Sequence, residues 1–399
     1  MRFNKALADR LSFQIVLLYA YAVLASFLVF NGRMPGLFAI LALVPLLRLP
    51  VVMAYGVPRR MSLDFKLLAL VVGCCYGALF LQWAFTPDYV DVRGRSITEF
   101  SALMLVGNTL WLLAGLAVSN ARYERSDLIA LGLISVALVM LIPNLGDGMV
   151  IVYSTLLESG SDSVNHLIVA EMFVVLVFAA FSFASGLGRW LVIPCAAFLL
   201  FAAGGRSSFY LGMMAMLAAQ FVMASYKERV VLLVFVALFA TWAGSYLLQA
   251  DDSLVERMLF SSGVDEDGSF QEREGLYRVG LSLLPEQILF GGPALYAREN
   301  RSVGSYIHNL LSVWQFFGLI PFLLICTMLG RALMRVRAEF VCFKDDVIYK
   351  FGALLCVYVS LSVAASKAVG FPLLWLALGF WGGRALALRK GNGSLRLPS

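Results

Sequence analysis

The stretch KLLALVVGCCYGALFLQWAFT, residues 66–86, decides the fold class, because it contains no charged residue after Lys66. A bilayer hydrocarbon core of about 30 Å requires about 20 apolar residues in one helix, and this stretch has that length. Similar runs recur along the 399-residue chain, in which 61% of the residues are hydrophobic and 14% are charged. An ordinary soluble domain has about 25% charged residues. The sequence therefore predicts an all-α polytopic membrane protein.

Charged residues and Gly, Pro or Asn bound these apolar runs and divide the chain into about twelve expected transmembrane helices. No low-complexity linker separates the runs, and no internal repeat of the kind found in many transporters is visible. The sequence therefore predicts a single membrane domain over residues 1–399. Its spans are expected near residues 11–30, 35–56, 66–86, 98–119, 128–145, 166–187, 190–204, 207–224, 230–249, 307–330, 347–365 and 369–386.

Basic residues gather in alternate loops, which the positive-inside rule assigns to the cytoplasm, so both termini are expected to be cytoplasmic. The net charge of +6 follows this topology and forms no single basic patch, so membrane lipids are expected partners and nucleic acid is not. The basic residues on this side are Arg2, Lys5, Arg10, Arg59, Arg60, Lys66, Arg122, Arg125, Arg189, Lys227, Arg229, Arg331, Arg335, Arg337, Lys344, Arg384, Arg389, Lys390 and Arg396.

The orientation leaves one large loop on the outer side, residues 250–306, between the ninth and tenth expected spans. Between residues 271 and 284, the apolar residues Leu276, Val279 and Leu283 recur at helical spacing. This periodicity predicts an amphipathic helix that lies along the outer membrane surface.

Four basic side chains on the outer side are the candidate functional residues. Arg206 lies in the sequence GGRSS between two spans, Arg273 and Arg278 lie on the predicted loop helix, and His308 lies in SYIHN where the loop enters the next span. Arginines bind phosphate oxygens in a bidentate manner, and an imidazole can accept a proton from a hydroxyl group. Together these groups suit glycosyl transfer from a polyprenyl diphosphate donor.

Each candidate also has a simpler interpretation. Arg206 could extend to phospholipid headgroups, the two loop arginines could pair with nearby carboxylates, and His308 could be a structural residue at the membrane interface. Glu171 and His166 are interpreted as an interfacial ion pair, and Glu171 and Arg48 as almost the only buried charges. The acidic run at residues 265–267 is interpreted as a solvated turn, and no metal is expected.

The order of these residues resembles the O-antigen ligase and polymerase superfamily. The resemblance covers roughly residues 190–330 and includes an R-x-x-x-(W/Y)-x-x-x-L motif, an H-N pair and a G-L-I sequence. The matching residues are Arg206, Arg273, Tyr277, Leu281, Pro285, Phe290, Gly291, Gly292, His308, Asn309, Gly318, Leu319 and Ile320.

The resemblance implies a type C-like glycosyltransferase architecture in the bacterial inner membrane. It implies transfer of a whole glycan from undecaprenyl diphosphate at the periplasmic face, without a cofactor or an obligatory metal. By position, His308 and Arg273 would be catalytic residues. The substrate-binding residues would be Arg206, Tyr277, Arg278 and Asn309.

The acceptor distinguishes three expected functions. A polymerase extends a lipid-linked O-antigen repeat unit, a ligase joins the glycan to the lipid A core, and a transporter forms no bond. The 250–306 loop is net acidic and would repel a phosphorylated lipid A core, which favours a polymerase, with a chain-length regulator as a further partner. Its carboxylates are Asp251, Asp252, Glu256, Asp265, Glu266, Asp267, Glu272, Glu274, Glu286 and Glu299, against Arg257, Arg273, Arg278, Arg298 and Arg301.

Overall fold

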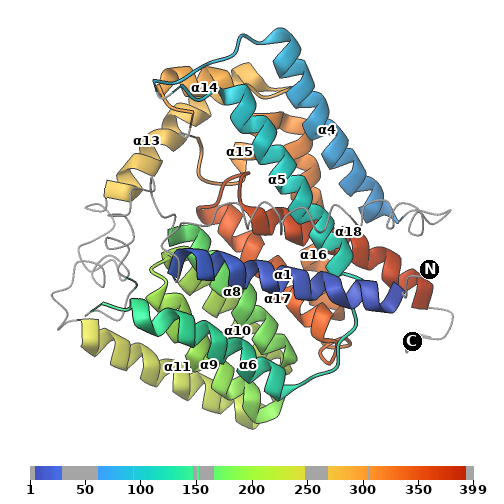
Figure 1. Ribbon diagram of the computed structural model, residues 1–399, viewed down its shortest axis with the longest axis vertical. Helices are drawn as coiled ribbons and strands as arrows, with labels where there is room; N and C mark the ends of the chain where they lie inside the picture. The colour runs from blue at the N-terminus through green and yellow to red at the C-terminus, as the bar shows by residue number, and fades with distance from the viewer. Residues whose placement is uncertain are drawn as a thin grey trace.

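The computed structural model describes residues 5–28, 62–92, 94–146, 151, 166–247, 268–303 and 306–391, which form helices joined by loops (Figure 1). The expected span at 35–56 and the acidic run at 265–267 lie outside these residues. The helices of the first half are α1 (Lys5–Leu28), α4 (Leu63–Phe85), α5 (Ile97–Val118), α6 (Asp127–Leu141), η2 (Ile142–Asn144), α8 (His166–Phe183), α9 (Gly186–Ala202), α10 (Arg206–Met223) and α11 (Tyr226–Leu247). Those of the second half are α13 (Gly268–Leu283), η3 (Leu284–Gln287), α14 (Pro293–Glu299), α15 (Leu311–Phe317), α16 (Leu319–Glu339), α17 (Val347–Ala365) and α18 (Pro372–Gly391).

Long apolar helices indicate that this is a helical membrane protein. Among the described residues, five helical segments are long and apolar enough to cross a membrane, and three shorter apolar helices accompany them. The expectation of about twelve spans remains a prediction. The five segments are Leu63–Phe85, Ile97–Val118, Asp127–Asn144, Leu319–Glu339 and Val347–Ala365, and the shorter helices are Ser12–Ala25, Leu167–Phe183 and Gly186–Ala202.

Helix α17 lies at the centre of the bundle and is mostly buried, in contact with α8, α10, α16 and α18. In Figure 1, α1, α17 and α18 cross the middle of the view, with α4, α5 and α13–α15 above them and α6, α9, α10 and α11 below. Helices α5 and α18 approach each other closely at Gly115. A Cβ atom on this residue would lie 2.1 Å from the Leu376 carbonyl oxygen. Small residues permit such contact between apolar helices, where lipid supplies no hydrophobic driving force.

The outward faces of the peripheral helices are apolar. Phe80 on α4 is 61% exposed, Leu103 on α5 is 74% exposed and Val139 on α6 is 69% exposed. Apolar side chains on the outside of a helical bundle are compatible with lipid as the surrounding medium.

Polar residues set where several helices begin. Ser62, Ser96 and Asp346 precede α4, α5 and α17, and each side chain accepts a hydrogen bond from a backbone N–H in the first turn, at 3.2, 3.1 and 3.0 Å. These N-caps satisfy donors that have no partner within the helix, and each contributes about 1 kcal/mol.

The expected span at 307–330 was wrong at its start, because the helix there is interrupted at Gly318. This residue has φ +89° and separates α15 from α16, so the long apolar helix covers Leu319–Glu339. The chain between η3 and α14 passes beside the break at Gly318 and bonds to both of its sides. The Leu319 amide donates to the Ile288 carbonyl at 2.8 Å, and the Gly292 amide donates to the Gln315 carbonyl at 2.9 Å. The interruption therefore arises from a tertiary contact.

Replacing Gly318 with alanine is expected to destabilise the protein by about 3 kcal/mol or more, because only glycine adopts this backbone conformation readily and a Cβ would lie 2.0 Å from the Leu289 carbonyl oxygen. Thermal unfolding of the detergent-solubilised protein measures the effect. Gly330→Ala is the matched control on α16, since a Cβ there meets no atom within 4 Å. Equal midpoints for the two variants would refute this explanation of the break.

Helix α13 occupies the loop segment predicted to be helical, and the apolar residues that indicated this helix contact protein; its position along the membrane surface stays a prediction. Leu276, Val279 and Leu283 pack on a small core formed by Leu284, Tyr296 and Ile307. The Tyr296 hydroxyl donates to the Leu276 carbonyl at 2.6 Å. The amphipathic pattern of α13 therefore reflects its packing on α14 and on the segment that precedes α15.

Candidate functional site

His308 lies in a short segment, residues 306–310, that is fixed to the bundle on both sides. The Ile307 amide donates to the Gln315 carboxamide oxygen at 3.0 Å, and the Leu310 amide donates to the Val363 carbonyl on α17 at 2.7 Å. The Tyr306 ring lies 5.2 Å from the imidazole, centroid to centroid. These contacts hold His308 between α15 and the end of α17.

Two cations act on His308 from different parts of the chain. Burial, followed by the positive charges of Arg273 on α13 and Lys367 in the α17–α18 linker, lowers the pKa of the imidazole from 6.5 to about 4. Arg273 and His308, both predicted from sequence, therefore lie within electrostatic reach of one another. His308 is neutral at physiological pH and can accept a proton.

Lys367 also forms a buried ion pair with Glu171 on α8. The ammonium nitrogen lies 2.6 Å from a Glu171 carboxylate oxygen, and the two side chains are 8% and 6% exposed. Burial and the Glu171 charge raise the pKa of the Tyr306 hydroxyl, which places the carboxylate in the same cluster. Among the described side chains, the partner of Glu171 is thus Lys367, and the His166 side chain of the expected ion pair lies outside the described residues.

The interpretation that Glu171 and Arg48 are almost the only buried charges was wrong. Asp64 on α4, Lys350 on α17 and Arg384 on α18 are buried as well. Asp64 pairs with Arg331 and Arg335 of α16 at the end expected to be cytoplasmic, so its charge is compensated locally.

Arg206 is the first residue of α10 and lies close to the turn of α8 that carries Glu171. The residue before it, Gly205, approaches Ala170 so closely that a Cβ atom would lie 2.6 Å from the Ala170 methyl group. Two residues further along α10, the Ser208 hydroxyl shares a hydrogen bond of 3.2 Å with the Tyr358 hydroxyl of α17. Arg206 therefore belongs to the same end of the bundle as His308.

The remaining predicted residues have other contacts. The Arg278 side chain is 77% exposed and pairs with Glu274 one turn away at 2.5 Å, while Tyr277 is exposed. The Asn309 carboxamide oxygen accepts the Leu311 amide at 2.9 Å, and its carbonyl accepts the Ser312 hydroxyl at 2.7 Å. Asn309 thus lies two residues before α15 and fixes the backbone beside His308.

Sequence analysis missed Lys367, although a signal was present. Lys367 falls between the last two expected spans, on the outer side, where the positive-inside rule disfavours cations. The same reasoning singled out Arg206. Because Lys367 departs from the positive-inside rule, the sequence alone could have identified it as a candidate functional residue.

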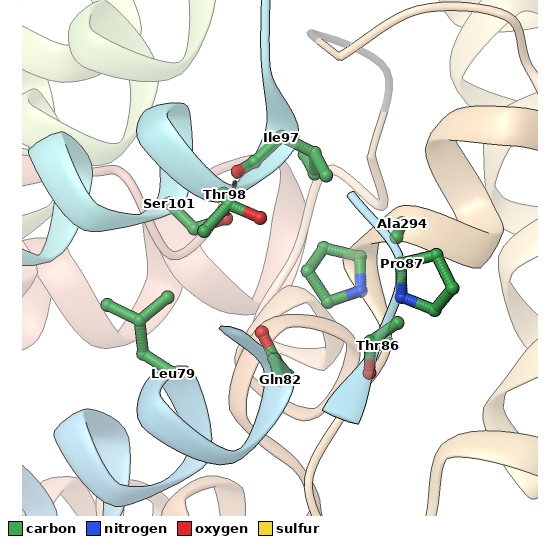
Figure 2. Close-up of a pocket in the computed structure, with 10 residues that line it drawn as sticks. Leu79, Gln82, Thr86, Pro87, Ile97, Thr98, Ser101 and Ala294 are labelled. Atoms are coloured by element: carbon green, nitrogen blue, oxygen red, sulfur yellow. Dashed lines mark hydrogen bonds between the residues drawn. The ribbon is translucent and has the colours of Figure 1, made fainter. Parts of the chain in front are cut away.

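A separate small pocket lies between α4, α5 and α14 (Figure 2), and none of the predicted site residues lines it. Its polar side chains bond within the fold: Thr98 donates to Asp88 at 2.8 Å, Ser101 donates to the Ile97 carbonyl at 2.8 Å, and Gln82 donates to the Phe316 carbonyl at 2.7 Å. The pocket thus offers few free polar groups. Among the described residues, no three His, Cys, Asp or Glu side chains gather as a metal site.

The lowered pKa of His308 predicts that its imidazole stays neutral from pH 8 down to about pH 5. The unfolded chain binds this proton near pH 6.5 and the folded chain only near pH 4, so acidification between these values favours unfolding. NMR of isotope-labelled histidine in a His166→Gln variant tests this, because the chain has two histidines. A midpoint near 6.5 would contradict the placement of His308 beside Arg273 and Lys367.

No family model matches this sequence, and no curated protein matches it either.

Proposed function

We propose that the chain is a membrane glycosyltransferase that transfers a glycan from undecaprenyl diphosphate to an acceptor hydroxyl group at the periplasmic face. The observation that carries the proposal is the neutral His308 imidazole with Arg273 and Lys367 within electrostatic reach. A neutral imidazole is the form that accepts a proton, and two cations beside it match a diphosphate leaving group.

In the proposed reaction, the acceptor oxygen forms a bond to the anomeric carbon of the donor sugar while the bond from that carbon to the diphosphate oxygen breaks. The hydroxyl proton passes to His308, and the electron pair of the broken bond leaves with undecaprenyl diphosphate. Arg273 and Lys367 stabilise the negative charge that develops on the leaving group. The guanidinium group of Arg273 can bind two phosphate oxygens at once.

Donor binding would also change the pKa of His308, the proposed general base. The positive charges of Arg273 and Lys367 contribute to the low pKa of His308, and an anionic diphosphate between them would offset those charges. The pKa of His308 would then rise towards neutrality, where an imidazole is an effective general base. The base would thus be strengthened when the donor is bound.

Polymerisation of O-antigen or a related surface polysaccharide is the preferred reaction, and ligation to lipid A core is the second candidate. The described part of the 250–306 loop keeps exposed carboxylates, such as Glu286 and Glu299. They would repel a phosphorylated lipid A core but not a repeat unit whose charge lies in its diphosphate.

Deletion of the gene, with the surface glycan then resolved by size, distinguishes the candidates. A polymerase predicts loss of the long ladder with one repeat unit retained on the core. Polymer that accumulates on the lipid carrier, with none attached to the core, would indicate a ligase. Unchanged glycan would refute the proposal.

Arg273→Lys is expected to reduce chain extension by at least tenfold, because an ammonium group cannot reproduce the bidentate contact of a guanidinium with a diphosphate. The length distribution of the glycan measures the effect in a strain that carries the variant. Arg298→Lys is the matched control: this arginine is exposed on α14 of the same loop and donates to the Pro87 carbonyl at 3.3 Å. Wild-type activity of Arg273→Lys would mean that a positive charge at this position is enough for chain extension and that the bidentate contact is not needed.

A further inference from the structure

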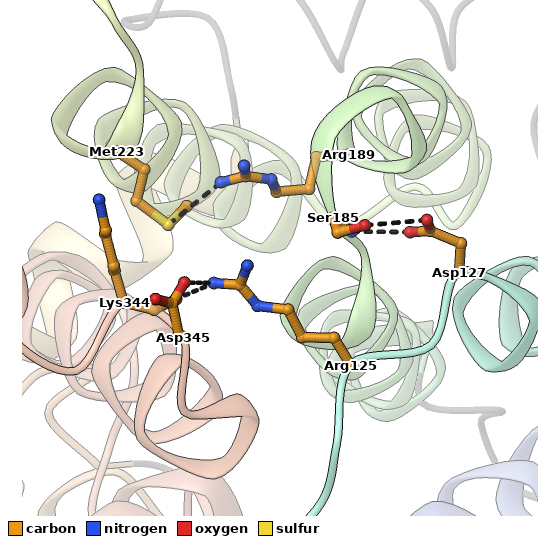
Figure 3. Close-up of polar contacts among 7 residues, drawn as sticks. All are labelled: Arg125, Asp127, Ser185, Arg189, Met223, Lys344 and Asp345. Atoms are coloured by element: carbon orange, nitrogen blue, oxygen red, sulfur yellow. Dashed lines mark hydrogen bonds and ion pairs between the residues drawn. The ribbon is translucent and has the colours of Figure 1, made fainter.

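Three cationic side chains gather at the end of the bundle expected to be cytoplasmic, away from His308. Arg125 lies in the α5–α6 linker, Arg189 in the first turn of α9 and Lys350 in the first turn of α17. Both arginines lie within electrostatic range of the Lys350 ammonium group. Figure 3 shows the two arginine side chains extending side by side, Arg189 towards Met223 and Arg125 towards Asp345.

The two arginines have few acceptors. Arg125 pairs with Asp345 and donates to the Lys344 carbonyl at 2.8 Å. Arg189 donates to the Met223 sulfur at 3.3 Å, which is a weak and uncharged acceptor for a guanidinium group. The Nε atoms of both arginines are buried without a hydrogen-bond partner among the described residues.

Lys350 is the least compensated of the three. Its side chain is fully buried, and its ammonium nitrogen has no hydrogen-bond partner in the described part of the chain. It also lies in the first turn of α17, where the helix dipole disfavours a cation. A buried ammonium group without an anion is costly, so the position calls for a negative charge.

The nearby carboxylates are bonded to other groups. Asp127 accepts from the Ser185 amide and hydroxyl, and Asp346 pairs with Arg384. Asp345 pairs with Arg125, and its side chain is 71% exposed. Glu228 also acts on Arg189, but its carboxylate accepts the Ser225 amide at 2.7 Å. Within the described part of the chain, no carboxylate therefore forms an ion pair with Arg189 or Lys350.

We propose that Arg125, Arg189 and Lys350 form a binding site for a phosphate group, supplied by the headgroup of an anionic phospholipid or by inorganic phosphate. Phosphate oxygens would accept the N–H groups of the two guanidinium groups and of Lys350. Basic sites between membrane helices on the cytoplasmic side suit phospholipid headgroups. Such a site would tie together the ends of α9 and α17 and the α5–α6 linker.

The test measures thermal unfolding of the full-length chain in neutral detergent, with either inorganic phosphate or phosphatidylglycerol as the probe. The wild type and an Arg229→Gln control should be stabilised, because Arg229 on α11 donates to the Phe221 carbonyl outside the cluster. Arg189→Gln and Lys350→Met should require about ten times more probe for the same shift, the effect of losing one charge-assisted hydrogen bond.

The two probes distinguish the sources: stabilisation by phosphate alone identifies a free-ion site, and stabilisation by the lipid alone identifies a headgroup site. If Lys350→Met does not fold, the comparison of Arg189→Gln with the Arg229→Gln control tests the proposal. Equal stabilisation of all four proteins, or of none, would overturn the proposal.

Discussion

Replacing His308 with alanine is expected to reduce glycan chain extension by a factor of about 10²–10⁴, the usual contribution of a general base. The imidazole is neutral, because burial, Arg273 and Lys367 lower its pKa to about 4, and alanine has no group that can accept the hydroxyl proton. The measurement is the glycan size distribution from cells that express the variant at the wild-type level in the membrane.

His166→Ala is the matched control, since it removes the other histidine of the chain. Folding should be little affected by His308→Ala, because the contacts that fix the 306–310 segment are made by Ile307, Leu310 and the backbone. A normal long-chain glycan in His308→Ala would remove His308 from catalysis.

Replacing Lys367 with methionine is expected to destabilise the protein by about 3–5 kcal/mol, because it leaves the Glu171 carboxylate buried without its partner. The two side chains are 8% and 6% exposed, so water cannot replace the lost contact. Thermal unfolding in detergent measures this loss.

The double variant Glu171→Leu, Lys367→Met separates stability from function. It removes both charges and should recover most of the lost stability, since replacing a buried ion pair with apolar groups is often neutral. It should remain inactive, because Lys367 is proposed to stabilise the leaving diphosphate. A double variant that regains chain extension would assign the pair a purely structural role.

The sequence could predict features that depend on neighbouring residues. The helical spacing of Leu276, Val279 and Leu283 indicated a helix that the structure extends over Gly268–Leu283. The placement of basic residues predicted which loops share a side, and Arg273 and His308 do lie within electrostatic reach.

The features that the sequence could not predict depend on contacts between distant parts of the chain. Glu171 and Lys367 are 196 positions apart, and neither residue signals its partner by local spacing. Gly318 lies within an apolar run that reads as continuous, and the break becomes apparent only when Leu289 lies against it. Whether the apolar face of α13 meets lipid or protein likewise depends on Tyr296 and Ile307, which the periodicity does not reveal.

Reconstitution of the purified chain tests the central claim most directly. Liposomes would contain the protein and an undecaprenyl-diphosphate-linked repeat unit, with no nucleotide sugar, and both the glycan length and the released undecaprenyl diphosphate would be measured. Longer glycans are expected to form together with free undecaprenyl diphosphate, and His308→Ala is expected to reduce both by a factor of about 10²–10⁴. Movement of the lipid-linked unit across the bilayer without any new glycosidic bond would contradict the central claim.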